Sequence, residues 1–122
     1  MRFYPRDSPQ DWIQGHGYRK QPLLEAGKLA CPGTRIQRVE IPPQGSVAAH
    51  HHKLQTEVFH FLEGTGYFIV NGRRLDCRPG DVLTVQPGDI HSTHNPGGAP
   101  WRYLAFKTNW AEDDLYWDAE LA

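Results

Sequence analysis

The sequence lacks the features that would place it in a membrane or on a nucleic acid. No run of apolar residues approaches the length of about 18 that a membrane-spanning helix needs, and residues 1–7 lack the apolar core of a secretory signal peptide. Lys and Arg total 13 against 14 Asp and Glu, so the net charge of −1 provides no basic surface for nucleic acid or anionic lipid. We therefore expect a cytoplasmic protein with no nucleic-acid or membrane partner.

Cysteine is also scarce. Cys31 and Cys77 form neither a CxxC pair nor a repeated spacing that would indicate a metal site or a disulfide framework. In a reducing cytosol we expect both to be free thiols, and a bridge between them is the alternative. The length of 122 residues predicts a single domain over residues 1–122.

Turn-forming residues, by contrast, are abundant. Among the 12 glycines and 10 prolines, those between Pro42 and Gly98 form clusters such as Asn71-Gly72 at intervals of 7–19 residues. Short segments separated by such turns are typical of an all-β sandwich or barrel. Segments such as 57–62 and 67–70 are rich in aromatic and β-branched residues and are expected to be strands. Residues 73–77 have weak strand propensity and are expected as the return strand of a hairpin. The other expected strands cover residues 34–41, 82–85, 90–94 and 101–106.

The two ends of the chain have weaker patterns. Residues 1–33 are expected to form short strands or an arm that packs on the main body. The segment after Asn109 is acidic and aromatic, and we expect a turn of helix or a surface arm. Between the ends, Asn71-Gly72 predicts a hairpin, because both central residues of a type I′ turn need a positive φ.

Histidine is the most unusual component of the sequence. Six of the seven histidines lie in residues 50–60 and 91–94. Alternate side chains of an extended chain share a face. If residues 48–53 are extended, His50 and His52 therefore lie on one face and His51 on the other, and the pair supplies two imidazoles to a metal from one side.

Two further residues complete a candidate ligand set. Glu57 begins the next expected strand, five residues after His52, and can supply a carboxylate. His91 follows the turn at residues 87–90 and can supply a third imidazole. This mixed set, His50, His52, Glu57 and His91, suits one divalent ion of Fe, Mn, Ni, Zn or Cu and leaves positions for water or a ligand.

Other side chains have weaker claims on the site, and none is assigned a catalytic role. His60 and His94 alternate out of phase with the ligands and are expected on the outer face or behind them, and His16 has no assigned role. Phe59 and Phe61 share the face of Glu57 and are expected to pack the core, with stacking on a substrate as the alternative. Four residues are expected near the barrel mouth: Gln55, Arg35, Trp101 and Tyr103. Asn95 is expected to form a hydrogen bond within the site.

Two segments resemble the sequence motifs of the cupins. Residues 45–64 carry the glycine, HxH, glutamate and glycine of the first motif, with Gly45 one residue closer to His50 than in the commonest form. Residues 80–95 carry the glycine, proline, histidine and asparagine of the second. The resemblance implies a small antiparallel β-barrel of jelly-roll type over about residues 34–108, with a metal bound by His50, His52, Glu57 and His91. The chain is also similar to small single-domain cupins related to phosphomannose isomerases.

The resemblance leaves the reaction open, because this fold hosts many activities. The first hypothesis is a metal-dependent enzyme of isomerase, epimerase or dioxygenase type that acts on a sugar, sugar phosphate, diol or keto acid. The alternative is a non-catalytic cupin with a bound small ligand or a structural metal, and a chain without metal is the third. Cupins are frequent homodimers, and Trp110, Tyr116 and Trp117 favour a homodimer unless they cover the chain's own barrel.

Overall fold

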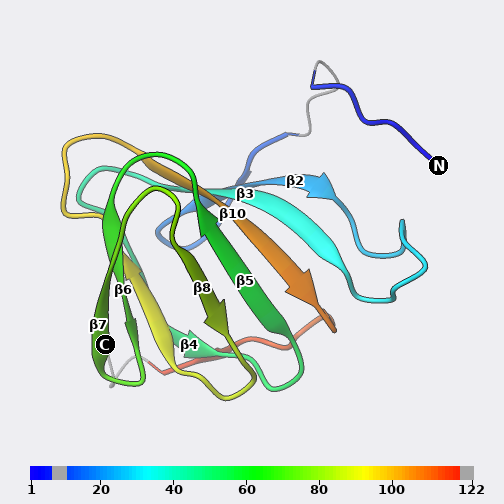
Figure 1. The fold of residues 1–122 in the computed structure, drawn as a ribbon. Helices are drawn as coiled ribbons and strands as arrows, with labels where there is room; N and C mark the ends of the chain where they lie inside the picture. Colours follow the sequence, from blue (N-terminus) through cyan, green and yellow to red (C-terminus); the bar gives the residue numbers. More distant parts are fainter. Residues whose placement is uncertain (7–10, 119–122) are drawn as a thin grey trace.

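The computed structural model describes residues 1–6 and 11–118, and this part of the chain contains strands and loops but no helix (Figure 1). The strands expected from the sequence are all present, with ends within two residues of those predicted. The described strands are β1 Ile13–Gln14, β2 Arg19–Leu24, β3 Arg35–Ile41, β4 Ser46–His51, β5 Thr56–Phe61, β6 Gly66–Val70, β7 Arg73–Cys77, β8 Val82–Val85, β9 His91–His94, β10 Trp101–Thr108 and β11 Tyr116–Trp117.

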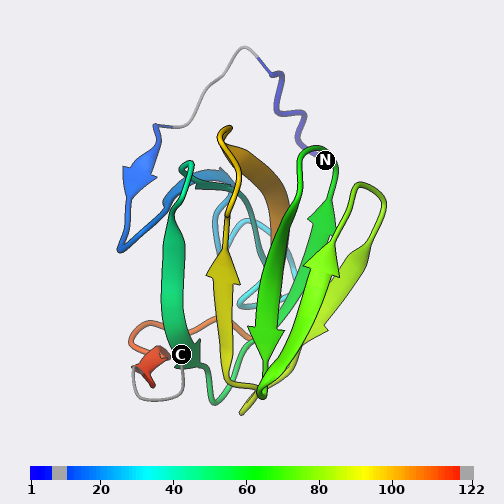
Figure 2. The ribbon, with the colours of Figure 1, turned by 90° about the vertical axis from the view of Figure 1, so that its left-hand side faces the viewer.

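The strands form two antiparallel sheets. One has the order β1-β2-β3-β10-β5-β8, and its strands run across the view from β2 to β8 in Figure 1. The other has the order β11-β4-β9-β6-β7 and faces the viewer in Figure 2. Neighbouring strands are mostly distant in sequence, as in a jelly roll. The all-β jelly-roll prediction is therefore confirmed, although no strand pairing within residues 11–118 joins the two sheets into a closed cylinder.

The alternation of side chains along β5 and β10 separates the interior from the outer face. In β5, Glu57, Phe59 and Phe61 are buried, whereas the residues between them are only partly buried. The register places Phe59 opposite Ala105 and Phe61 opposite Tyr103, so inward side chains of both strands lie side by side. This period of two is the pattern that predicts strands from the sequence.

The hydrophobic core fills part of the space between the sheets. Phe61, Phe68 and Trp101 are at most 1% exposed, and the rings of Phe61 and Trp101 stack with centroids 5.4 Å apart. Phe59 joins them, 4.9 Å from Phe68, which confirms that Phe59 and Phe61 pack the core. The expectation that Trp101 reaches the barrel mouth is wrong, because its ring is enclosed by this aromatic cluster.

The hairpin of β6 and β7 turns at Asn71 and Gly72. Their φ angles of 50° and 81° are both positive, as a type I′ turn requires, and the flanking residues Val70 and Arg73 pair with each other. The predicted hairpin is confirmed.

Two Pro-Gly-Asp turns are held by the same side-chain contact. The carboxylate of Asp81 accepts a hydrogen bond from the backbone N–H of Arg78, and that of Asp89 accepts one from Gln86, both at 2.8 Å. Aspartate favours turns because its side chain can replace a backbone acceptor in this way. The second turn leads directly into β9 and so fixes the position of His91.

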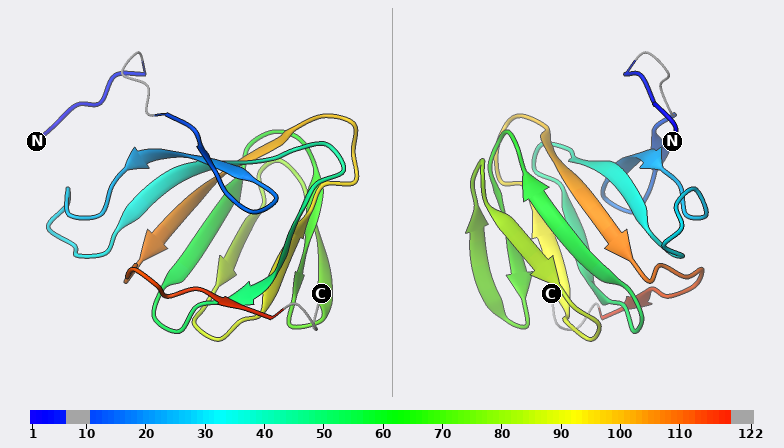
Figure 3. Two further views of the ribbon diagram at one scale, coloured as in Figure 1. Left: turned by 180° about the vertical axis from the view of Figure 1, so that it is seen from behind. Right: turned by 45° about the vertical axis from the view of Figure 1, so that its right-hand side comes forward.

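Within residues 109–118, the segment after β10 forms a loop with one turn and the short strand β11, and no helix. The expected helical turn is therefore wrong, and the alternative, an arm, is correct. Tyr116 and Trp117 form β11, which pairs with His51 and His50 on β4. The ring of Tyr116 stacks on His51 with centroids 5.2 Å apart, and the carboxylate of Asp118 accepts a hydrogen bond from the same histidine. Figure 3 shows this C-terminal arm passing below β10 and β5 to reach β4.

Neither cysteine forms a disulfide. Cys31 is exposed and Cys77 is buried, and both are free thiols as expected. Burial raises the pKa of Cys77 to about 11, so this thiol is protonated and unreactive at neutral pH.

Candidate metal centre

A β-bulge in β4 turns His50 toward the interior. The register between β4 and β9 shifts between Val47 and His50, which breaks the simple alternation of inward and outward side chains. Val47 and His50 consequently both line the interior cavity although they stand three residues apart, and His52 lies on the same side. His51 contacts the C-terminal arm instead, on the opposite face, as predicted.

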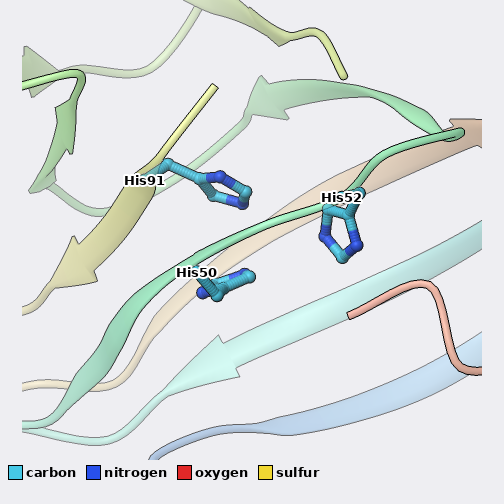
Figure 4. Close-up of side chains that lie close together, drawn as sticks. All are labelled: His50, His52 and His91. Carbon is cyan, nitrogen blue, oxygen red and sulfur yellow. The ribbon is translucent and has the colours of Figure 1, made fainter. Parts of the chain in front are cut away.

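His50, His52 and His91 form one cluster. A ring nitrogen of each lies within 4.8 Å of those of the other two. His50 and His91 are cross-strand partners on β4 and β9, and His52 follows the end of β4 (Figure 4). Three imidazoles this close together can bind a metal ion.

A backbone carbonyl orients each of the three rings. Nδ1 of His50 donates a hydrogen bond to the carbonyl of Ala48 at 2.7 Å, and Nδ1 of His91 donates one to the carbonyl of Asp89 at 3.0 Å. Nδ1 of His52 donates to the carbonyl of Asp114. A neutral ring that is protonated at Nδ1 presents its lone pair at Nε2, so these contacts set the tautomer that a metal ligand needs.

Glu57 faces the same point from the other sheet. Its Oε1 lies 2.9 Å from Nε2 of His52 and 3.4 Å from Nε2 of His91. This oxygen is buried and receives no well-directed hydrogen bond from the described residues. Burial alone would raise the pKa of Glu57, but the imidazoles of His52 and His91 and the charge of Lys107 outweigh it and hold the pKa well below the usual range.

The electrostatics favour a neutral imidazole at His50 and a charged carboxylate at Glu57. Burial, together with the neighbouring His91, lowers the pKa of His50 to about 4. At neutral pH this ring is therefore uncharged and has a free lone pair. A neutral nitrogen donor close to an ionised, unsatisfied carboxylate oxygen is an arrangement that a cation completes, so the residues fit the metal implied by the sequence.

The centre opens into a cavity of about 370 Å³ between the sheets. Phe59 and Val47 form part of its wall, and residues 110–115 of the C-terminal arm form another part. The polar side chains that the six-stranded sheet and the β4–β5 loop contribute are Tyr18, Lys20, Gln37, Gln55, Tyr103 and Lys107. A volume of this size is typical of a small-molecule site.

Two buried amides in this cavity have unsatisfied polar atoms. Gln37 is 3% exposed and Gln55 2% exposed, yet Oε1 of Gln37 and Nε2 of Gln55 have no hydrogen-bond partner among the described residues. Buried polar atoms are nearly always paired. These two atoms are therefore placed to bind a ligand or water in the cavity.

Sequence reasoning placed Gln55 and Tyr103 near the site but missed Lys20, Gln37 and Lys107. A signal for two of them was present. Lys107 shares the parity of Tyr103 along β10, and Gln37 shares the parity of the buried Val39 along β3. Lys20 gave no such signal, because the short strand β2 has a weak pattern.

Two expected site residues lie elsewhere. The Arg35 side chain lies over the ring of Trp110, 4.4 Å from its centroid, and pairs with Glu25 at 3.1 Å, so the expectation that it lines the mouth is wrong. Asn95 was expected to bond within the site, but its amide donates to the carbonyls of Ile41 and Ala99, outside the cavity. Asn95 follows the last residue of β9, so strand parity no longer governs its direction.

The remaining histidines lie outside the cavity. His94 stacks on Tyr67 with centroids 4.7 Å apart and contacts the hydroxyl of Ser92 through Nε2 at 2.8 Å. His60 is on the outer side of β5, between inward-facing neighbours. The rings of His16 and Trp117 lie edge to face, with centroids 5.9 Å apart.

A known protein family matches the part of the chain that carries this centre. The cupin domain matches residues 37–107, a span that includes all four candidate ligands. The chain belongs to the cupin family. This cupin is 35% identical over 83 residues to the oxalate-binding protein of Thermotoga maritima, in a match that covers 68% of this chain and 69% of that protein.

Two further similarities support the family and the fold. This cupin is 30% identical over 91 residues to mannose-1-phosphate guanylyltransferase of Klebsiella pneumoniae, a match of 71% of the chain to only 19% of that enzyme, which agrees with the expected phosphomannose-related similarity. A solved structure of a predicted oxalate decarboxylase from Thermotoga maritima has a TM-score of 0.78 at 23% identity and covers 89% of this cupin and 100% of that chain. Within the described residues, no helix has the length and apolarity to span a bilayer.

Proposed function

We propose that this cupin binds one divalent transition-metal ion through Nε2 of His50, His52 and His91 and the carboxylate of Glu57. The support is the convergence of three oriented imidazoles on a buried carboxylate oxygen that lacks a directed partner. The set contains no soft sulfur ligand, so Fe, Mn, Ni, Zn and Cu are the suitable ions.

On this metal centre we propose an enzyme that acts on a small polar molecule. The observation that carries the proposal is the position of the four donors, which come together from both sheets at a 370 Å³ cavity whose walls also carry polar side chains. A bound ion would supply Lewis acidity toward a ligand oxygen. Sugars, sugar phosphates, diols and keto acids are the classes with oxygens so placed, in an isomerase, epimerase or dioxygenase reaction.

The chain's own residues would bind and orient such a molecule. Burial raises the pKa of Tyr103, so its phenol stays protonated and can donate a hydrogen bond into the cavity. The amide of Gln55 presents an unpaired donor at Nε2. Phe59 and Val47 exclude water from the side of the cavity next to the core.

Elemental analysis and a turnover assay test this function. Untagged wild-type protein should contain about one ion per chain, and His91→Ala should contain less than about 0.1. His94→Ala, which changes a histidine outside the cavity on the same strand, should keep the wild-type content. Turnover on a panel of sugars, diols and keto acids should disappear in His91→Ala and on chelation. Metal-loaded protein that converts no member of the panel would contradict the enzymatic proposal.

A second candidate function is non-catalytic binding of a small acid. It is favoured by the relative in Thermotoga maritima, which is named for oxalate binding rather than for a reaction. Calorimetry would then show metal-dependent binding of oxalate or a related acid, with no product detected by mass spectrometry after long incubation.

Three expectations of the sequence remain proposals: a cytoplasmic location, a single domain over residues 1–122, and a homodimer. The tail aromatics contact their own chain, since Trp110 lies against Arg35 and Trp117 lies 5.2 Å from the ring of His50. Tyr116 and Trp117 nevertheless keep 37% and 45% of their surface exposed. Gel filtration of the full chain against a chain truncated after Thr108 tests the dimer.

A further inference from the structure

One group of cavity residues takes no part in the proposed metal centre. Lys20, Gln37 and Lys107 project from β2, β3 and β10 toward the interior of the six-stranded sheet and line the cavity. Lys107 is the cross-strand partner of Glu57, and Lys20 is the partner of Val39, which the chain places two residues after Gln37. The group therefore lies on the same wall as Glu57, facing the cavity that the histidines border from the other sheet.

Neither lysine has an acidic group of the described residues within ion-pair distance, although the charges of Lys107 and its cross-strand neighbour Glu57 interact. Among the described residues neither ammonium group forms a hydrogen bond or an ion pair within 4.0 Å, although both side chains are largely withdrawn from solvent. Arg35, the third cation nearby, pairs with Glu25 at 3.1 Å. Partly buried, unpaired cations beside one another are unfavourable, because each lowers the stability of the other's charge.

The acidic groups of the cavity are engaged or distant. Glu57 faces His52 and His91. The carboxylate of Asp114 accepts three backbone hydrogen bonds from residues 53–55. Glu112 and Asp113 are exposed on the C-terminal arm.

Gln37 provides an independent indication of a ligand at the same place. Its Oε1 is buried, unpaired and on the strand between those of Lys20 and Lys107. Opposite Gln37 stands Ala105, whose small side chain leaves room above the sheet. The two ammonium groups can bind an oxyanion. The amide oxygen of Gln37 between them can accept a hydrogen bond from a hydroxyl of that ligand or from a water that hydrates it.

We infer that Lys20, Gln37 and Lys107 form a second subsite of the cavity, on the wall that also carries Glu57, which binds a negatively charged oxyanion of the ligand. This inference rests on the proposed metal centre and names its ligand class: a molecule with a metal-binding pair of oxygens at one end and a carboxylate or phosphate at the other. The cavity of 370 Å³ has room for about a dozen water molecules at ~30 Å³ each, more than a two-carbon acid fills.

A matched pair of probes tests the subsite. 2-Hydroxyglutarate and 2-hydroxypentanoate share the same hydroxy-acid head and chain length, and differ in the terminal carboxylate. With zinc-loaded wild-type protein, calorimetry should show that 2-hydroxyglutarate binds about tenfold tighter or more. A second pair, 3-phosphoglycerate and glycerate, reports whether a terminal phosphate is preferred to a carboxylate.

The variants assign this preference to the lysines. Lys20→Gln and Lys107→Gln should each reduce the ratio of the two affinities to less than about threefold, with zinc content unchanged. Lys107→Arg keeps the charge and should keep most of the preference, which separates loss of charge from loss of folding. Lys28→Gln, an exposed lysine outside the cavity, is the control and should behave as wild type.

The outcomes separate this inference from the proposed metal centre. Equal affinities of wild-type protein for the two members of each pair would overturn the subsite even if zinc binds stoichiometrically. If no metal binds, the metal centre fails, and the subsite is measured alone with glutarate and metal-free protein. Binding of glutarate that depends on Lys20 and Lys107 would then support the subsite, and its absence would reject it.

Discussion

The backbone carbonyl of Asp114 accepts a hydrogen bond from Nδ1 of His52, and the Asp114 carboxylate accepts hydrogen bonds from the N–H groups of Lys53, Leu54 and Gln55. One residue of the C-terminal arm thus holds both a candidate metal ligand and the loop that follows it. Asp114 is 6% exposed, and these backbone hydrogen bonds help to keep its pKa low although burial opposes them.

Removing this carboxylate should weaken metal binding without removing a ligand. Asp114→Ala leaves three backbone N–H groups unpaired, which costs about 1–3 kcal/mol of the free energy of unfolding. The carboxylate holds the arm against the loop after His52, so without it the Asp114 carbonyl should no longer be fixed against the ring of His52, and metal affinity should fall about 10–100-fold. Competition with a chromogenic chelator measures the affinity and urea unfolding the stability. Glu112→Ala, an exposed residue of the same arm, should change neither; an unchanged affinity in Asp114→Ala would contradict the orienting role.

Glu40 should make stability depend on pH. Its carboxylate accepts hydrogen bonds from Arg19 and, at 2.7 Å, from Nε of Arg102. These contacts, that of Arg19 first, hold the pKa of Glu40 below its value in the unfolded chain. The stabilisation is therefore complete above about pH 5 and is lost as the pH falls through the folded-state pKa.

The comparison of Glu40→Gln with wild type tests this sign. At pH 7 the variant should be less stable by about 1–3 kcal/mol, and the difference should shrink as the pH falls from about 5 to about 3. Urea unfolding at each pH measures it. Glu63→Gln, an exposed glutamate, is the control. A difference that is constant over this pH range would show that the ionised carboxylate does not contribute.

Metal should stabilise the folded chain by mass action. At free metal of 100 times the dissociation constant, the gain is about 2.7 kcal/mol, and chelation should remove it. Thermal unfolding with increasing zinc measures the effect. In His50→Gln the melting temperature should respond only weakly to zinc, whereas His60→Gln, on the outer side of β5, should respond as wild type does. Equal responses of the two variants would place the zinc elsewhere.

Gly66 should not tolerate a side chain. A Cβ at this position would lie 2.3 Å from Cε3 of Trp101, a ring in the centre of the core, and 2.8 Å from the carbonyl oxygen of His94. Gly66→Ala should therefore destabilise the fold by about 1–3 kcal/mol or more. At Gly98 a Cβ would meet no atom within 4 Å, so Gly98→Ala should stay within about 0.5 kcal/mol of wild type. Chemical unfolding of the two variants distinguishes them.

Much of the fold could be predicted because local chemistry determines it. The positive φ required by Asn71 and Gly72 fixes one hairpin, and the period of two in β5 separates Glu57 and Phe59 from the outward His60. Spacing also predicted the four residues that the structure brings together. The bulge after Val47 could not be predicted, since it depends on pairing with a strand far along the chain.

The rest of the cavity depends on tertiary structure. The position of Lys20 in the site follows from the pairing of β2 with β3, which no local pattern specifies. Asp114 lies in a segment without periodicity, and only the path of the arm brings it to His52. For Asn95 the local pattern gave a wrong prediction. The alternation of side chains was extended one residue beyond the end of β9, where it no longer determines the direction of the side chain.

The hydrogen bond between His52 and Asp114 joins residues 62 positions apart. During translation the N-terminal parts of a chain leave the ribosome first, so His50 and His52 emerge well before His91, and His91 before the arm that carries Asp114. On the proposed metal centre, an ion that meets the chain before His91 emerges would find at most three of the four candidate ligands, and none of the support that the arm provides. If the chain binds a metal as proposed, loading would follow folding, and the free-metal supply at that moment would decide which ion is bound.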